Sequence, residues 1–83
     1  MAEKTRGFTT QLISPSDRER LQAEIYFDGK YVATVSQERG EGLFDLETPE
    51  SSWEEEFVVR KVDLVGFQAA VETACRRLKG EIK

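Results

Sequence analysis

The stretch "EIYFDGKYVATVSQERGEG", residues 24–42, contains two turn signals separated by a run of alternating apolar and polar side chains. Successive side chains of a strand point to opposite faces of a sheet, so this period predicts strands on both sides of Asp28 and Gly29. The second signal, a Gly-x-Gly at 40–42, does not match a phosphate-binding loop, because no helix follows it and glutamates lie beside it. The stretch therefore predicts the centre of an antiparallel sheet.

The length of the first turn decides which side chains share a face, because a shift of one residue in the pairing moves every side chain of a strand to the opposite face of the sheet. A two-residue turn at Asp28 and Gly29 would put the apolar rows of the two strands on opposite faces. A three-residue turn that also includes Phe27 places Ala23 opposite Ala33 and keeps both rows on one face. We therefore predict the three-residue turn, with Gly29 in the left-handed conformation that glycine tolerates.

Two further strands are predicted after this hairpin. A four-residue turn at 38–41 continues the apolar face onto a strand over 42–48, which Pro49 ends because proline has no amide to donate to a neighbour. Alternation resumes over 55–61 and predicts the fourth strand. The predicted sheet thus has three to four strands and one apolar face.

The C-terminal part of the chain has the signals of a helix. Asp63 is a suitable N-cap, and Gly80 suits the position after the last turn. Apolar residues recur at steps of three and four and form one stripe, which consists of Leu64, Phe67, Val71, Cys75 and Leu78. Packing this stripe on the apolar face of the sheet gives the predicted fold class, a two-layer α+β domain in ββββα order with one C-terminal helix on one face.

The start of the chain is predicted to lie outside this domain. Residues 1–15 show no sustained period and are expected to form a flexible N-terminal arm, although residues 7–13 could also form a short strand. A capping-box spacing predicts a single helical turn at 16–20. Residues 16–83 then form a single α+β domain, because 83 residues allow one hydrophobic core at most.

The composition limits where the protein acts. One cysteine allows no internal disulfide, and small chains without disulfides are typical of reducing compartments. No apolar run is long enough to cross a membrane, and the first residues lack the apolar core of a signal peptide. We therefore expect a cytoplasmic protein that does not act in a membrane.

The residue types argue against catalysis. The chain has no histidine, which is the commonest general base and a frequent zinc ligand. Cys75, the single thiol, falls on the apolar stripe and is expected to be a core residue and not a nucleophile. The carboxylates lack the spacing of a calcium loop, and one helix on one sheet offers little of the concavity that a carboxylate enzyme needs. We predict no catalytic residue, no metal site and no cofactor.

The charges are unevenly distributed along the chain. Residues 38–56 carry eight carboxylates and one arginine, whereas residues 57–83 carry six basic and three acidic side chains. The net charge of −4 and the lack of a basic, aromatic-studded sheet face argue against nucleic acid as a partner. An acidic surface instead suits a basic protein partner.

A candidate partner surface follows from the predicted strands. Its members are apolar or acidic side chains expected on the solvent side of the sheet or in its loops. They are Tyr26, Phe27, Val32, Leu43, Asp45, Glu47, Trp53 and Val58. Exposed apolar side chains ringed by carboxylates would form a docking patch for a basic protein or for a second copy of the chain.

The segment "AEIYFDGKYVATVSQERG", an acidic strand and the helix "VDLVGFQAAVETACRRL" together resemble short conserved hypothetical proteins of Gram-negative bacteria. The resemblance extends from Ser16 to the end of the chain and rests on turns and a capped helix, so it implies no activity. We expect a small acidic, non-enzymatic protein-interaction module. Two alternatives stay open: an immunity or antitoxin-type inhibitor of a basic toxin, and a structural homodimer without a ligand.

Overall fold

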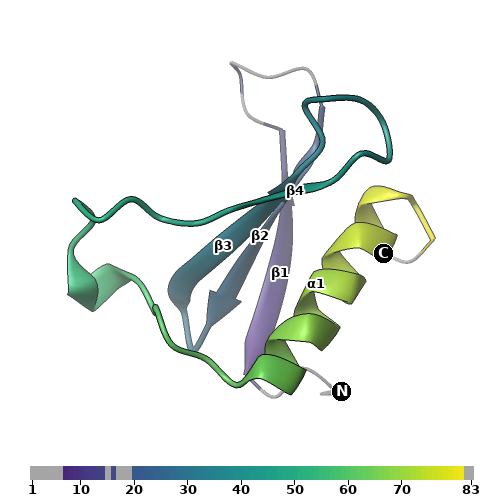
Figure 1. Ribbon diagram of the computed structural model, residues 1–83. Coiled ribbons are helices and arrows are strands. Elements are labelled where there is room, and N and C mark those ends of the chain that lie inside the picture. The colour runs from purple at the N-terminus through teal and green to yellow at the C-terminus, as the bar shows by residue number, and fades with distance from the viewer. Residues whose placement is uncertain (1–6, 15, 17–19, 82–83) are drawn as a thin grey trace.

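The computed structural model describes residues 7–14, 16 and 20–81, which form an antiparallel four-stranded sheet followed by one α-helix (Figure 1). The elements are β1 (Phe8–Ile13), β2 (Gln22–Phe27), β3 (Lys30–Ser36), β4 (Asp45–Glu47), the 3-10 helix η1 (Glu55–Phe57) and α1 (Leu64–Leu78). Strands adjacent in the sequence are neighbours in the sheet, in the order β1-β2-β3-β4. This arrangement confirms the predicted α+β fold in ββββα order.

The first strand, β1, falls within residues 1–15, where the sequence predicts a flexible arm. It pairs antiparallel with β2 along its whole length, and its Phe8 is only 5% exposed. Arg77 of α1 donates from Nη1 to both the carbonyl and the hydroxyl of Thr10 at 2.7 Å, which fixes the helix to this strand. A paired strand therefore replaces the middle of the predicted arm. The N-terminal end of that arm, and most of the helical turn predicted at 16–20, lie outside the described residues.

The turn between β2 and β3 has two residues, and the predicted three-residue turn is wrong. Asp28 and Gly29 have φ angles of 51° and 82°, so both are left-handed, which is the signature of a type I′ turn. Aspartate tolerates this conformation better than most residues because its short side chain can bond locally. Phe27 consequently pairs with Lys30 and belongs to β2 instead of the turn.

A β-bulge, and not the turn, brings the apolar rows of β2 and β3 onto one face. Tyr26 pairs with Tyr31, but the next pair is Ile25 with Ala33, so Val32 is the extra residue of β3. Beyond the bulge, alternation places Ile25 and Ala33 on the inner face, as the sequence predicts for these two residues. The bulge also lets Val32 join the core, where it is 7% exposed.

The strand β4 is shorter than the predicted strand over 42–48. The turn before it extends to Leu43, whose amide donates to the carbonyl of Gly40 at 3.0 Å. Gly40 and Gly42 both have positive φ angles, and the amide of Gly42 donates to the side-chain carbonyl of Gln37 at 3.2 Å. These contacts hold the chain in turn conformations, so pairing with β3 begins only at Asp45.

The strand predicted over 55–61 is wrong, because this segment begins with η1. Arg60 donates from Nε to Glu55 Oε2 at 2.7 Å, which draws the two ends of the segment together. The part that follows η1 touches the sheet through a single parallel bridge between Val58 and Tyr31, and the amide of Val59 donates to the Tyr31 carbonyl at 2.9 Å. The fourth strand of the sheet is instead β1, which comes from the N-terminal part of the chain.

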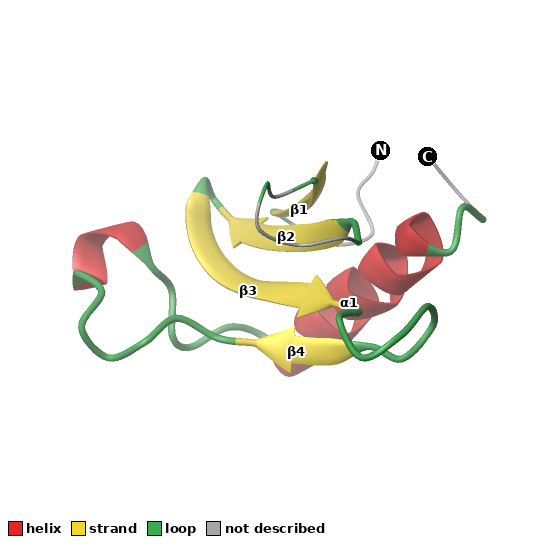
Figure 2. Cartoon of the chain, turned by 90° about the horizontal axis from the view of Figure 1, so that it is seen from above, coloured by secondary structure: helices red, strands yellow, loops and turns green. Residues whose placement is uncertain are grey.

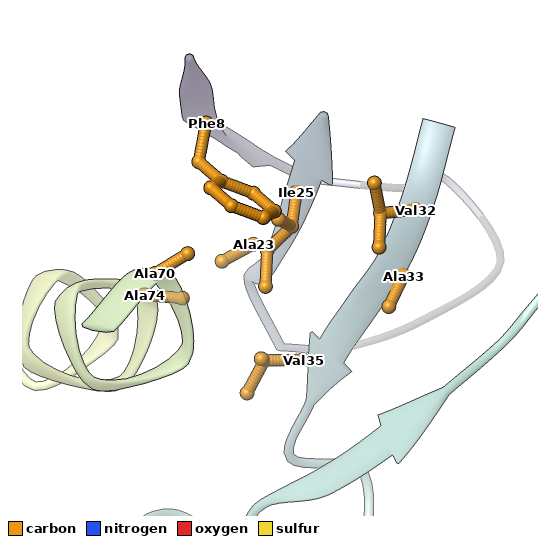
Figure 3. Close-up of a cluster of buried hydrophobic side chains, with 8 residues drawn as sticks. All are labelled: Phe8, Ala23, Ile25, Val32, Ala33, Val35, Ala70 and Ala74. Carbon is orange, nitrogen blue, oxygen red and sulfur yellow. The ribbon is translucent and has the colours of Figure 1, made fainter. Parts of the chain in front are cut away.

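The core lies between α1 and the sheet, because α1 covers one face (Figure 2) and packs mainly on β1 and β2. The main cluster of buried apolar side chains comes from β1, β2, β3 and α1 (Figure 3) and consists of Phe8, Ala23, Ile25, Val32, Ala33, Val35, Ala70 and Ala74. The residues of the predicted stripe from Phe67 to Leu78 lie at the margin of this cluster and are partly buried. The first residue of that stripe, Leu64, is 66% exposed and does not pack on the sheet.

The buried face of α1 consists of small residues at steps of four, namely Gly66, Ala70 and Ala74. A Cβ atom at Gly66 would lie 3.0 Å from the Phe8 ring, so glycine allows β1 and α1 to approach closely. Asp63 caps the same end of the helix by accepting a hydrogen bond from the Gly66 amide at 2.7 Å. The helix therefore packs on the sheet through its small residues, and the larger apolar residues lie at the margin of the contact.

Replacing Gly66 with valine is expected to lower the free energy of unfolding by about 1–3 kcal/mol, because the added side chain overpacks the contact with Phe8. Urea denaturation measures the loss. Gln68→Val is the control: it introduces valine at an exposed position of α1 and should change the free energy of unfolding by only about 0.5 kcal/mol. Equal losses in the two variants would contradict the close approach at Gly66.

Candidate functional site

The structure separates the eight residues of the predicted partner surface into an interior and an exterior group. Three of them lie inside. Phe27 faces Phe8 across the strand pair, with ring centroids 4.9 Å apart, and Val32 is the bulge residue that joins the core. Val58 is 4% exposed at its bridge to Tyr31. Val32 and Val58 are buried and Phe27 is partly buried against the core, so none of the three takes the exposed position that the sequence predicts.

The other five predicted residues reach the surface, at different places. Tyr26 is partly exposed on the outer face, which is the face of the sheet opposite α1, and Asp45 and Glu47 are partly exposed on the strand β4. Leu43 lies in the turn before β4 and is 50% exposed. Trp53 lies in the loop before η1 and is 45% exposed.

Three aromatic rings form a continuous strip over the outer face. The Tyr26 and Tyr31 rings meet edge to face, with centroids 5.9 Å apart. Trp53 lies over Tyr31, with centroids 5.1 Å apart and an interplanar angle of 31°. The predicted three-residue turn would pair Tyr31 with Ile25 on the inner face, but its pairing with Tyr26 places it on the outer one. We call Tyr26, Tyr31 and Trp53 the aromatic strip.

Carboxylates lie beside this strip because the register aligns them. Glu24 on β2 and Glu47 on β4 are both opposite Thr34 of β3, on the same outer face. Glu24 accepts a hydrogen bond from the Tyr26 hydroxyl at 2.8 Å, and Tyr31 and Thr34 share a hydrogen bond between their hydroxyls. Burial raises the pKa of Tyr31, and the charges of Glu24 and Glu47 act in the same direction, whereas its hydrogen bond with Thr34 acts against them. The outer face therefore combines aromatic rings with negative charge.

Arg60 holds the loop that carries Trp53. Besides its ion pair with Glu55, its Nη2 donates to the carbonyls of Glu50 and Trp53, at 3.1 and 3.4 Å. The guanidinium thus joins both ends of the loop to the start of the segment that leads to α1. Because these donors are fixed in one plane, they hold the backbone of Trp53 in place over Tyr31.

The acidic segment 38–56 surrounds the β4 side of the sheet. Six of its carboxylates are exposed, on Glu38, Glu41, Glu50, Glu54, Glu55 and Glu56. Two arginines offset part of the charge, because Arg39 pairs with Asp45 at 2.8 Å and Arg60 with Glu55 at 2.7 Å. Since the segment contains eight carboxylates, a surplus of negative charge remains on this side of the molecule.

Tyr26 is expected to ionise late in an alkaline titration. Burial, followed by its hydrogen bond to Glu24 and the charge of Glu24, raises its pKa from 10.0 to about 12. In the unfolded chain the phenol ionises near 10.0, so its stabilising contribution is complete below that pH and is lost as the pH rises through about 12. Stability should therefore fall with rising pH in this window.

Urea unfolding at stepped alkaline pH, together with the absorbance of the phenolate, measures this effect. In a Tyr26→Phe variant the late phenolate signal should vanish and the alkaline loss of stability should shrink to the part that Tyr31 contributes. An unchanged alkaline loss in that variant would show that Tyr26 is not its source.

A second surface lies on the inner face, on which the sequence predicts one packed helix. A groove with a volume of about 300 Å³ opens beside α1, over β3 and β4. Its lining is mainly apolar and consists of Val32, Ala33, Leu46, Val59, Val62 and Phe67, together with Thr48, Pro49 and Arg60. Leu46 of β4 is 48% exposed.

The dimensions of the predicted elements, and no motif in the sequence, could have revealed this groove. A helix with its side chains is about 10–12 Å wide, whereas strands repeat every 4.7–4.9 Å, so one helix covers about two strands of four. Since α1 packs on β1 and β2, the inner face of β4 has no helix above it.

Within the described residues, no group of three or more histidine, cysteine, aspartate or glutamate side chains could hold a metal ion. Cys75 is partly buried beside the core, and burial raises the pKa of its thiol, so less of the reactive thiolate is present at neutral pH. No helix in the described part of the chain is long and apolar enough to cross a membrane.

No protein-family model, curated protein or solved structure matches this chain. The resemblance to short hypothetical proteins of Gram-negative bacteria therefore stays a prediction. Any inference about function has to start from the two surfaces, the aromatic strip with its carboxylates and the apolar groove.

Proposed function

We propose that the protein is a small, non-enzymatic interaction module that binds a cationic surface of a partner protein. The observation that supports this most directly is the aromatic strip with Glu24 and Glu47 beside it. Aromatic rings attract ammonium and guanidinium groups through their π faces, and carboxylates pair with the same groups. The combination suits lysine and arginine side chains.

The surplus of negative charge on the segment 38–56 supports the same partner. Its field extends beyond the strip and would raise the rate at which a basic protein meets this side of the molecule. An inhibitor of a basic toxin would be one case of such binding. A homodimer through this side is less compatible with the charges, because two copies would bring their carboxylates together.

Fluorescence offers a direct test, because Trp53 is the single tryptophan of the chain and belongs to the strip. A lysine- and arginine-rich peptide should change its emission, whereas a glutamate-rich peptide of equal length should not. Raising the salt concentration from about 0.1 M to about 1 M shortens the Debye length from about 10 Å to about 3 Å and should weaken the binding strongly. No salt-sensitive change with the cationic peptide would overturn the proposal.

Charge variants locate the binding face. Exposed ion pairs contribute about 0.2–1 kcal/mol each, so Glu24→Gln combined with Glu47→Gln should reduce the affinity for the cationic peptide about two- to thirtyfold. The matched control combines Glu72→Gln with Glu81→Gln, which removes the same charge from α1 and its C-terminal end. Equal losses in the two double variants would indicate attraction to net charge without a specific face.

A further inference from the structure

The strand β1 forms one edge of the sheet and turns the backbone groups of alternate residues away from β2. The Asp28 amide donates to the Gly7 carbonyl at 3.1 Å, so these two residues are a hydrogen-bonded pair at the start of the β1–β2 ladder. Such pairs alternate with non-bonded ones along an antiparallel ladder. Every second residue over 9–13, beginning with residue 9, therefore bonds to β2. The backbone groups of Thr10 and Leu12 face the open edge.

Leu12 is the residue at which this open edge offers both a donor and an acceptor. The Thr10 carbonyl already accepts a hydrogen bond from Arg77 Nη1 at 2.7 Å. No group among the described residues bonds to the Leu12 amide or carbonyl, and Leu12 is partly exposed. A further strand could therefore pair with β1 at Leu12 without displacing the contact between Arg77 and Thr10.

The strand β1 lacks the features by which edge strands avoid pairing. Edge strands are usually protected by their short length, by charged side chains or by proline. β1 has six residues, with neither a charge nor a proline among them, whereas β4 at the other edge has three residues, two of which are acidic. Of the two edges of the sheet, the β1 edge is thus the one suited to an added strand.

The positions of the charges favour a second copy of the chain as the source of that strand. A lysine- or arginine-rich strand would meet the guanidinium of Arg77 at this edge and no carboxylate on β1. The acidic strand β4 lies at the opposite edge of the sheet (Figure 2). Two copies that pair through β1 therefore keep their β4 strands at the two far ends of the joined sheet, where their repulsion is weakest.

We propose that the protein forms a twofold-symmetric dimer in which β1 pairs antiparallel with β1 of a second copy, with the axis at Leu12. A twofold contact brings the same residue of each copy together, so the two Leu12 residues exchange both of their backbone hydrogen bonds. The four strands of each copy then form one continuous sheet. Because the axis is perpendicular to the sheet, both aromatic strips face the same side and stay open to a partner. This inference does not rest on the proposed function.

The dimer is expected to be weak, because β1 contributes six residues per copy and a standard interface contains about 20–30 residues a side. We expect a dissociation constant between about 10 µM and about 1 mM. Sedimentation velocity of the full chain over this concentration range should show the mean mass rising from one copy toward two. A chain that stays monomeric at about 1 mM, or that grows beyond two copies, would overturn the proposal.

The variant Leu12→Lys tests where the two copies meet. It would place two ammonium groups directly opposite each other across the axis, and like charges in that position oppose pairing. The dissociation constant should therefore rise about tenfold or more. Leu64→Lys, which makes the same change at an exposed leucine of α1, is the matched control and should leave the constant unchanged. Circular dichroism checks that both variants fold, and equal dissociation constants for the two would contradict the β1 contact.

Hydrogen exchange of the unmodified chain provides a readout that does not depend on a variant. The Leu12 amide should exchange more slowly as the protein concentration rises, because it becomes hydrogen-bonded only in the dimer. The amides of Gln11 and Ile13 are bonded to β2 in the single chain as well, so their exchange should change much less. Protection of the Leu12 amide that is independent of concentration would assign this edge to another segment of the same chain and overturn the dimer.

Discussion

Replacing Phe8 with alanine is expected to lower the free energy of unfolding by about 3–5 kcal/mol. Phe8 is 5% exposed, and its ring contacts the ring of Phe27 on β2 and that of Phe67 on α1, with centroids 4.9 and 6.4 Å away. The loss of the ring would leave a cavity where β1, β2 and α1 meet. A domain of this size buries a small core, so the variant should be largely unfolded at physiological temperature.

The matched control for this variant is Phe57→Ala. Phe57 ends η1 and is 61% exposed, so the same truncation should cost about 0.5 kcal/mol or less. Thermal and urea denaturation of the two variants measure the difference. Equal and small losses would mean that the segment around Phe8 behaves as the arm predicted from the sequence and not as a strand of the sheet.

Deleting one residue of β3 should unfold the protein if the residue lies beyond the bulge, but not if it is the bulge residue itself. Deleting Thr34 would turn Val35, which is 2% exposed in the core, to the outer face and Ser36 to the inner one. The core would lose the packing of Val35 and gain the hydroxyl of Ser36 without a partner, which costs about 1–3 kcal/mol in itself, so the variant should not fold.

Deleting Val32 instead removes the extra residue of the bulge. Tyr31 would still pair with Tyr26 and Ala33 with Ile25, so every other side chain keeps its face of the sheet. The expected cost is the burial of one valine, about 1.5–3 kcal/mol, and the protein should remain folded. Circular dichroism and urea denaturation of both deletions test this. Unfolding of both variants to the same extent would contradict the assigned bulge.

The sequence allowed the fold class to be predicted because periodicity is a local property. The two-residue period of β2 and β3 and the cap at Asp63 are set by neighbouring residues, and the structure has both the hairpin and the capped helix. The register was mispredicted for a different reason. The faces of Ala23 and Ile25 can be matched to Ala33 and Val35 of β3 by a longer turn or by a bulge. The two solutions differ at Tyr31 and Val32, which exchange faces.

The candidate site was less accessible from the sequence, because it depends on contacts between distant segments. The loop of Trp53, which lies over Tyr31, is bonded to the distant Arg60. The strand β1 pairs with β2, and its Phe8 packs against Phe67 of α1. Residues 55–61 have the alternating pattern of a strand. In the structure Glu55 instead belongs to η1 and forms an ion pair with Arg60. The groove follows from how far one helix reaches across four strands, which no single segment encodes.

The brevity of β4 has a consequence for how the protein behaves at high concentration. An edge strand can template the addition of strands from other molecules, and long apolar edges are therefore sites of aggregation. β4 has three residues, two of which, Asp45 and Glu47, are acidic. Few backbone groups are thus available at this edge, and an incoming identical strand would meet like charges. The glycines that shorten β4 therefore also act as gatekeepers, since they limit the length over which one molecule could template the next.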